Sequence, residues 1–184
     1  MVIKKKMKKV LVFAGSNSKK SINQILVIHA SQLLDSVDVK IISLTDFEAP
    51  IYGLDLEMNE GFPKSMIDLY NLFQKTDGFI IGVPEHNGSM PAVMKNTLDW
   101  VSRQGGKIFQ EKPVVFLGTS PGKRGGISAM NHVLDIMPHR GAIIIGHYNL
   151  PNFNDHYTGS GLSKEVTMEL SQLMNKFQSI ILEQ

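Results

Sequence analysis

Two short polar segments of this chain carry the residue types that hold phosphates and flat polar rings. The first is GSNSKKSIN at residues 15–23, which supplies serine hydroxyls, amides and two lysines just before a segment of helical period. Hydroxyls and the free N–H groups at the start of a helix together form a site that suits a phosphate. The simpler alternative makes Ser21 only a helix N-cap, with Gln24 completing a capping box; both roles are compatible.

The second segment is PEHNGSMP at residues 84–91. Pro84 and Pro91 stiffen its backbone, and Gly88 allows a ligand to approach closely. Successive N–H groups in such a turn can face the acceptors of a flat polar ring. The alternative is an ordinary strand-to-helix turn, with Ser89 or Met90 as the cap and Pro91 in the first helical turn.

The surrounding elements decide whether these two segments meet. Five short runs rich in Val, Ile and Phe mostly lack polar alternation, as expected of parallel strands covered on both faces. They span residues 8–15, 37–44, 77–84, 112–120 and 140–146. Segments of helical period span residues 22–34, 64–73, 93–101, 127–137 and 164–181. The alternation predicts an α/β fold, a doubly wound parallel sheet of order 2-1-3-4-5 with helices on both faces.

In such a sheet, ligands bind beyond the carboxyl ends of the strands, where the strand order reverses. The reversal lies between the first and third strands, so the two polar segments flank one crevice. A ligand with both a phosphate and a flat ring would occupy both. The residues therefore point to flavin mononucleotide (FMN).

Composition limits the remaining possibilities. The chain has 184 residues, 42% of them hydrophobic, and a formal net charge of +2, which suits one domain and does not indicate a nucleic-acid surface. We expect a basic tail at residues 1–9, which hold a lysine cluster, and a single domain at residues 10–184. No apolar run approaches the roughly 18 residues of a membrane span. Because there is no cysteine, a cytoplasmic protein without cysteine metal sites is expected.

Three motifs, in the right order, resemble the NADPH-dependent FMN reductase family of flavodoxin-like proteins, which includes quinone, chromate and azo-dye reductases. They are AGSNSKKSIN at residues 14–23, PEHNGSMPAVMKNTLDW at residues 84–100 and GTSPGKRGG at residues 118–126. The resemblance implies that the first loop holds the FMN phosphate, the second holds the isoalloxazine ring, and residues 120–126 close on the ring from the other side. The implied cofactor-binding residues are Ser16, Ser18, Ser21, Ile22, Asn23, Pro84, Glu85, His86, Asn87, Gly88, Ser120 and Gly122.

Two positions depart from the family pattern. Many members carry an arginine where this chain has Ser18, and a tyrosine where it has His86. Lys19 or Lys20 could supply a point charge in place of the arginine. An imidazole can become cationic, so His86 could tune the flavin electrostatically. The alternative is that it only packs against the ring or hydrogen-bonds the backbone.

Other candidate groups carry less chemistry. His132, Asp135 and His139 lie near helical spacing, but Pro138 should end the helix before His139, so no metal site is expected. We expect His29 and His132 to be packed helix residues. Residues 120–126 either hold an NADPH phosphate or form a mobile turn.

The expected function is that of an FMN-dependent oxidoreductase that passes two electrons from NADPH or NADH to a small acceptor. The cofactor carries the chemistry, so no catalytic acid or base is named. The alternatives are a flavodoxin-type electron carrier and an FMN-binding regulatory protein. The resemblance also implies a homodimer or homotetramer, in which Trp100 is either at the margin of the core or in a subunit interface.

Overall fold

The computed structural model describes residues 7–184 and contains a five-stranded parallel sheet of order β2-β1-β3-β4-β5. This order and the parallel pairing are those expected from the sequence. The strands are β1 (Lys9–Ala14), β2 (Asp38–Ile41), β3 (Gly78–Gly82), β4 (Lys112–Thr119) and β5 (Ala142–Leu150). The central strands β1, β3 and β4 are almost wholly buried, because helices cover both of their faces.

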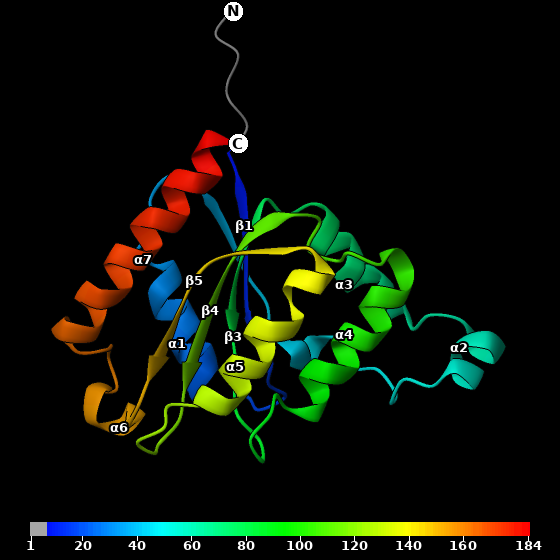
Figure 1. The fold of residues 1–184 in the computed structure, drawn as a ribbon, viewed down its shortest axis with the longest axis horizontal. Coiled ribbons are helices and arrows are strands. Elements are labelled where there is room, and N and C mark those ends of the chain that lie inside the picture. Colours follow the sequence, from blue (N-terminus) through cyan, green and yellow to red (C-terminus); the bar gives the residue numbers. More distant parts are fainter. Residues whose placement is uncertain (1–6) are drawn as a thin grey trace, which may run out of the picture.

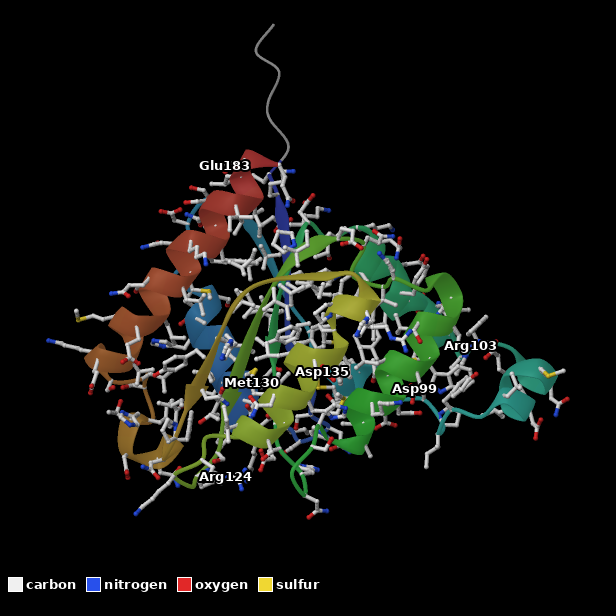
Figure 2. All side chains as sticks on the ribbon, in the orientation of Figure 1. Asp99, Arg103, Arg124, Met130, Asp135 and Glu183 are labelled. Atoms are coloured by element: carbon white, nitrogen blue, oxygen red, sulfur yellow. The ribbon has the colours of Figure 1, made fainter. Side chains whose placement is uncertain are left out.

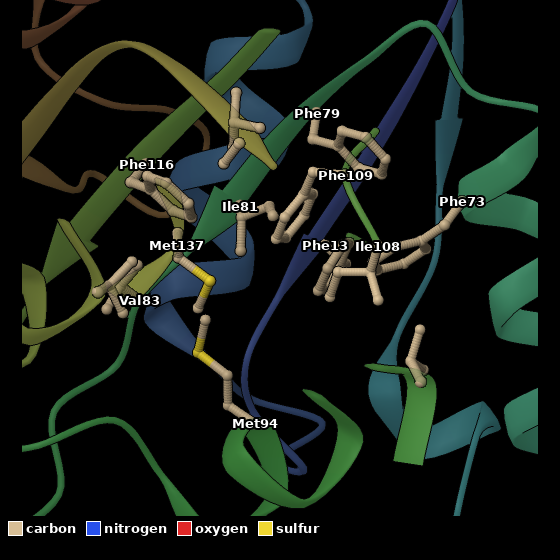
Figure 3. Close-up of a cluster of buried hydrophobic side chains, with 14 of the residues drawn as sticks. Phe13, Phe73, Phe79, Ile81, Val83, Met94, Ile108, Phe109, Phe116 and Met137 are labelled. Carbon is tan, nitrogen blue, oxygen red and sulfur yellow. The ribbon is translucent and has the colours of Figure 1, made fainter. Parts of the chain in front are cut away.

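Each face of the sheet has its own core. One face packs against α1 (Ile22–Ser31) and α7 (Lys164–Glu183), and the other against α3 (Lys64–Gln74), α4 (Ala92–Gly105) and α5 (Ile127–Ile136) (Figure 1). The second core is rich in aromatic rings: Phe73 and Phe79 lie with centroids 5.1 Å apart, and Phe79 meets Phe109 edge-on at 5.2 Å (Figure 3). These contacts pack β3, whose carboxyl end carries the second polar segment, against α3 and the chain before β4.

The five expected helices are present within a few residues of their expected ends. The short elements were not expected; they are η1 (Leu44–Asp46), α2 (Leu54–Glu60), η2 (Pro138–Arg140) and α6 (Phe153–His156). The fifth strand is longer than expected, since it runs past Gly146 to Leu150. Gly146 does not end the strand but lies at a register shift, where an added Cβ would be 2.6 Å from a Leu173 methyl on α7.

Residues 48–63 form an arm that stands away from the body of the molecule and carries α2 (Figure 1). Trp100 on α4 is fully buried beneath it and donates its indole N–H to the Pro50 carbonyl at 2.8 Å. The rings of Tyr52 and Phe62 meet Trp100 edge-on. Trp100 is therefore a core residue that anchors the arm, and its side chain is not available for a subunit interface.

A charged contact holds the outer part of the arm. Arg103 on α4 donates to both carboxylate oxygens of Glu57, at 2.8 and 3.2 Å, and the Tyr52 hydroxyl donates to the same carboxylate at 2.9 Å. Figure 2 shows Arg103 on the side of α4 that faces α2. The hydrogen bonds from Arg103 are the main reason that the pKa of Glu57 lies below its ordinary value.

The expected basic tail falls mostly outside the described residues, which begin at Met7. Its last residue, Lys9, is the first of β1, and Lys8 lies 3.9 Å from an Asp77 carboxylate oxygen. None of the helices within residues 7–184 is long and apolar enough to cross a membrane.

Candidate functional site

The two polar segments and the loop after β4 emerge at the same end of the sheet, beyond the carboxyl ends of β1, β3 and β4 (Figure 1). We call residues 15–21 the first loop, residues 84–91 the ring loop and residues 120–126 the third loop. The first and ring loops leave neighbouring strands, since Ala14 pairs with Gly82 and the Gly15 N–H donates to the Gly82 carbonyl at 2.9 Å. The reversal of strand order between β1 and β3 therefore lies between these two loops, as expected.

The first loop is ordered by its own serines. Ser16 Oγ accepts from the Ser18 N–H at 3.1 Å, and Ser18 Oγ accepts from the Lys20 N–H at 3.3 Å. Ser18, Lys19 and Lys20 are exposed. A Cβ added at Gly15 would lie 2.8 Å from the Met94 Cβ on α4, so glycine lets the first loop pass close to this helix.

The first loop leads into the start of α1, which has the features of an anion site. Ser21 Oγ caps the helix by accepting from the Gln24 N–H at 3.2 Å, which leaves its hydroxyl proton free to donate. Within residues 7–184 the N–H groups of Ile22 and Asn23 have no hydrogen-bond partner, and the first turn holds no acidic residue. An anion here would be stabilised by these N–H groups and by the helix dipole.

Of the capping box expected at Ser21, the structure has the bond from the Gln24 N–H to Ser21 Oγ but not the return bond from the Gln24 side chain to the Ser21 backbone. The Gln24 side chain accepts from the Ala14 N–H at 2.8 Å and donates to the Ile42 carbonyl at 3.1 Å. It therefore bridges β1 and the end of β2, and does not return to the Ser21 backbone. Sequence spacing does not reveal this, because the competing partners come from strands.

Asn23 joins the first loop to the end of β4. Its side-chain N–H donates to the Thr119 carbonyl at 3.1 Å, and its side-chain oxygen accepts from the Thr119 N–H at 2.9 Å. Asn23 is 4% exposed and Thr119 is 1% exposed. The Asn23 side chain is thus held by Thr119, while the backbone N–H of Asn23 is left open at the start of α1.

The ring loop contains a tight two-residue turn. The His86 N–H donates to the Ser89 carbonyl at 2.9 Å, and the Ser89 N–H returns to the His86 carbonyl at 3.1 Å. Asn87 and Gly88, at the tip, have φ of 51° and 78°, the positive pair that type I′ turns require and that Asn-Gly adopts readily. His86, Asn87 and Gly88 are exposed. Pro84, in contrast, is buried.

Glu85 does not share the exposure of its neighbours. Its Oε2 accepts from the backbone N–H groups of Ser128 at 2.9 Å and Ala129 at 3.1 Å, in the first turn of α5. A second link joins the ring loop to α5, since Ser89 Oγ lies 2.8 Å from His132 Nδ1. His132 is exposed, so the expectation that it is packed is wrong; it faces the ring loop and not the core.

The third loop is anchored on its far side by the chain that follows β5. The Phe153 N–H donates to the Ser120 carbonyl and the Asn152 N–H to the Gly122 carbonyl, both at 3.1 Å, and the Ser120 hydroxyl also donates to Gly122 at 3.1 Å. Residues 121–124 remain exposed at its tip, where Arg124 contacts Ser128 (Figure 2). The backbone of Ser120 and Gly122 is therefore held in place, while the side chains of Lys123 and Arg124 lie at the exposed tip.

A pocket of about 330 Å³ lies beside the first loop and was not expected from the sequence. It is formed by Asn17, the chain between η1 and the arm, and the first turns of α4. The apolar part of its lining is Leu44, Phe47, Ala49, Ile51, Ala92 and Val93. No periodic pattern marks residues 47–51, so the sequence carried no signal for it.

The start of α1 and the ring loop fit FMN in their donor chemistry. The anion site at α1 suits a phosphate, as described above. At the other end, the N–H groups of Asn87 and Gly88 have no partner among residues 7–184, so they can donate to ring acceptors. No three His, Asp or Glu side chains gather closely enough to hold a metal ion in the part of the chain that the structure describes.

Comparisons with known proteins point the same way. A family model described as NADPH-dependent FMN reductase matches residues 8–178. The quinone reductase of Escherichia coli strain K12 is 33% identical over 106 residues, 58% of this chain and 55% of that protein. This chain thus aligns with only about half the length of that relative. The 2-hydroxy-1,4-benzoquinone reductase of a Burkholderia species is 28% identical over 174 residues, 92% of this chain and 93% of the relative.

Solved structures give the same fold. A flavoenzyme NAD(P)H:(acceptor) oxidoreductase from Paracoccus denitrificans matches with a TM-score of 0.76 and 26% identity, over 96% of this chain and 98% of that one. An azoreductase from Bacillus anthracis matches with a TM-score of 0.60 over 94% of this chain and 100% of that one. Its 19% identity supports the shared fold alone.

Proposed function

Because the chain belongs to the NADPH-dependent FMN reductase family, we propose that it is an oxidoreductase that passes two electrons from NAD(P)H, through FMN, to a small acceptor. A quinone is the acceptor class we favour, with free flavins and azo compounds as the other members of the expected range. The overall reaction is balanced when NAD(P)H and one proton convert a quinone to a hydroquinone and leave NAD(P)⁺.

FMN is the cofactor of this family and NAD(P)H its co-substrate. When bound, FMN supplies the hydride-accepting and electron-donating chemistry, and the protein supplies binding, orientation and hydrogen bonds. We therefore assign no acid or base among the side chains. The roles proposed below are binding roles.

The phosphate end belongs to the first loop and the start of α1. The Ser21 hydroxyl and the N–H groups of Ile22 and Asn23 donate to the phosphate, with the hydroxyls of Ser16 and Ser18 beside them. Lys19 and Lys20 add positive charge in place of the arginine that many relatives carry at the position of Ser18. The ring loop holds the isoalloxazine through the turn at residues 86–88, above the buried Pro84. Ser120 and Gly122 shape the opposite wall.

The observation that carries this proposal is that, within the described chain, unpaired backbone N–H groups lie on both sides of the point where the strand order reverses, between β1 and β3. Open N–H groups at Ile22 and Asn23 lie at the start of α1, directly after the first loop, and open N–H groups at Asn87 and Gly88 lie on the ring loop. The two loops leave adjacent strands. A ligand with a phosphate at one end and a flat acceptor ring at the other satisfies both sets. A mononucleotide needs only these two sets of donors, one for its phosphate and one for its ring.

The test is the visible spectrum of the purified chain, identification of the released cofactor, and steady-state oxidation of NADH and NADPH with and without a quinone. We expect a yellow protein that releases FMN and oxidises the nicotinamide in proportion to added quinone. A protein that stays colourless after incubation with FMN would contradict the proposal. Bound FMN without quinone-dependent turnover would favour the electron carrier or a regulatory protein.

We further propose that the chain forms homodimers or homotetramers in the cytoplasm. The arm supports the first part, because it exposes Ile51 (87%), Leu54 (55%) and Met58 (75%) on a segment with little core of its own. Light scattering of the native chain and of a Leu54→Glu, Met58→Glu variant tests this. A monomer in both cases would contradict it.

A further inference from the structure

The first turn of α5 takes its cap from another loop. A helix leaves its first N–H groups without partners inside the helix, and a side chain at the N-cap usually satisfies one of them. In α5 the N-cap is Gly126, which has no side chain and a φ of 79°. Glu85 supplies the missing acceptor, since its Oε2 lies 2.9 Å from the Ser128 nitrogen and 3.1 Å from the Ala129 nitrogen.

This contact is stronger than an ordinary turn hydrogen bond. A carboxylate that accepts from backbone N–H groups makes charge-assisted hydrogen bonds, and its negative charge faces the positive end of the helix dipole. Gly126 lies beside Glu85, since a Cβ added there would be at an ordinary contact distance of 3.8 Å from the Glu85 Cβ, and the positive φ at this position favours glycine. Within residues 7–184, the other hydrogen bond between the ring loop and α5 joins the side chains of Ser89 and His132.

The contact between Glu85 and α5 links the ring loop to the helix that follows the third loop. Glu85 lies between the buried Pro84 and His86, where the exposed turn begins, and α5 follows directly on the third loop. The third loop is already fixed on its far side by Asn152 and Phe153. Glu85 therefore fixes the distance between the ring loop and the third loop.

We propose that Glu85 is a positioning residue that sets the width of the crevice for the flavin ring by capping α5. This inference rests on the proposed function, and it gives Glu85 a role that requires no direct contact with the flavin. It predicts that loss of the Glu85 carboxylate weakens binding at the ring end and leaves the phosphate end unchanged.

The experiment measures the dissociation constants of FMN and riboflavin with the native apoprotein, Glu85→Ala and Glu85→Gln, by quenching of flavin fluorescence. Glu85→Ala should weaken both flavins by the same factor, about tenfold, which corresponds to the loss of a charge-assisted hydrogen bond. Glu85→Gln keeps an oxygen that accepts the two N–H groups, so it should recover most of the affinity. Glu165→Ala, which removes an exposed acidic residue from the first turn of α7, is the matched control and should change neither constant.

Hydrogen exchange supplies a second readout. The amides of Ser128 and Ala129 should exchange faster in Glu85→Ala than in the native apoprotein. Faster exchange with an unchanged riboflavin affinity would make Glu85 only a helix cap and would overturn the proposal. A loss confined to FMN, or an equal loss in Glu85→Gln and Glu85→Ala, would also overturn it.

Two further outcomes separate this proposal from the proposed function. A native chain that binds neither flavin overturns the proposed function itself, and the flavin role of Glu85 with it. If Glu85→Ala does not fold, Glu85→Gln decides alone. It should then weaken both flavins by about threefold, since a neutral oxygen is a weaker acceptor than a carboxylate, and unchanged constants would overturn the positioning role.

Discussion

Replacing Asn23 by alanine should lower the stability of the apoprotein while leaving the flavin-binding backbone in place. The Asn23 amide pairs with both peptide groups of Thr119, at 2.9 and 3.1 Å, where α1 meets the end of β4. Alanine removes both partners at once. The remaining Thr119 N–H and carbonyl are buried, because Thr119 is 1% exposed.

The size of the effect follows from these two groups. A buried peptide group that loses its hydrogen-bond partner costs about 1–3 kcal/mol. With both Thr119 groups affected, Asn23→Ala should lower the free energy of unfolding by about 3 kcal/mol. At an m value of about 3 kcal/mol per molar urea, the unfolding midpoint should fall by about 1 M.

Urea unfolding of the apoproteins, followed by far-UV circular dichroism, measures this difference. Asn17→Ala is the matched control, since Asn17 is exposed on the first loop, just before α1, and the change should alter stability by no more than about 0.5 kcal/mol. Asn23→Asp should be destabilised as well, because a carboxylate cannot donate to the Thr119 carbonyl. A loss below about 1 kcal/mol in Asn23→Ala would refute the assignment of the amide pair as a main link between α1 and β4.

Two other predictions test the phosphate end and the arm. Ser21→Ala should weaken FMN binding by about 1–2 kcal/mol, since it removes a hydrogen-bond donor and the helix cap together. Riboflavin, which has no phosphate, should bind the variant as well as it binds the native chain. Equal losses of affinity for both flavins, measured by fluorescence quenching, would place the phosphate elsewhere. The pKa of Glu57 lies below its ordinary value of 4.5, mainly because Arg103 donates hydrogen bonds to its carboxylate. The contact therefore stabilises the folded arm fully above pH 4.5, and this stabilisation is lost as the pH falls through the lower pKa of the folded state. Fluorescence of Trp100, the chain's single tryptophan, should shift to longer wavelength in that acid range and should lack this step in Glu57→Gln; identical acid profiles would contradict the role of Glu57.

The sheet order and the main helices could be predicted because they depend on local periodicity and on rules for parallel strands. Buried runs such as residues 77–84 and the helical period of residues 164–181 carry this information directly. The arm could not be predicted, since α2 buries none of its own residues and depends on Trp100 and Arg103 from α4. The end of β5 was misplaced because Gly146 allows α7 to pack closely and does not act as a turn residue.

The positions of the polar loops were also predictable, since parallel strands bring their carboxyl ends to one edge, and the comparisons confirm the expected family. The partners of individual side chains were not predictable. Gln24, Asn23 and Glu85 each bind backbone groups on other elements, and such partners depend on tertiary placement. Sequence patterns identify the residues that can hydrogen-bond, but which distant peptide group they meet is decided by packing.

The pairing of Asn23 with Thr119 also bears on the order in which contacts form as the chain is synthesised and folds. These residues are 96 positions apart in the chain, and Glu85 is 43 positions from Ser128. A growing chain that has emerged only through β3 holds the first loop and β3, but neither Thr119 nor Ser128. Contacts across such separations form late, because closing a long loop has an entropic cost before the contact is made. We therefore expect the first loop and the ring loop to reach their final positions only after β4 and α5 have joined the sheet.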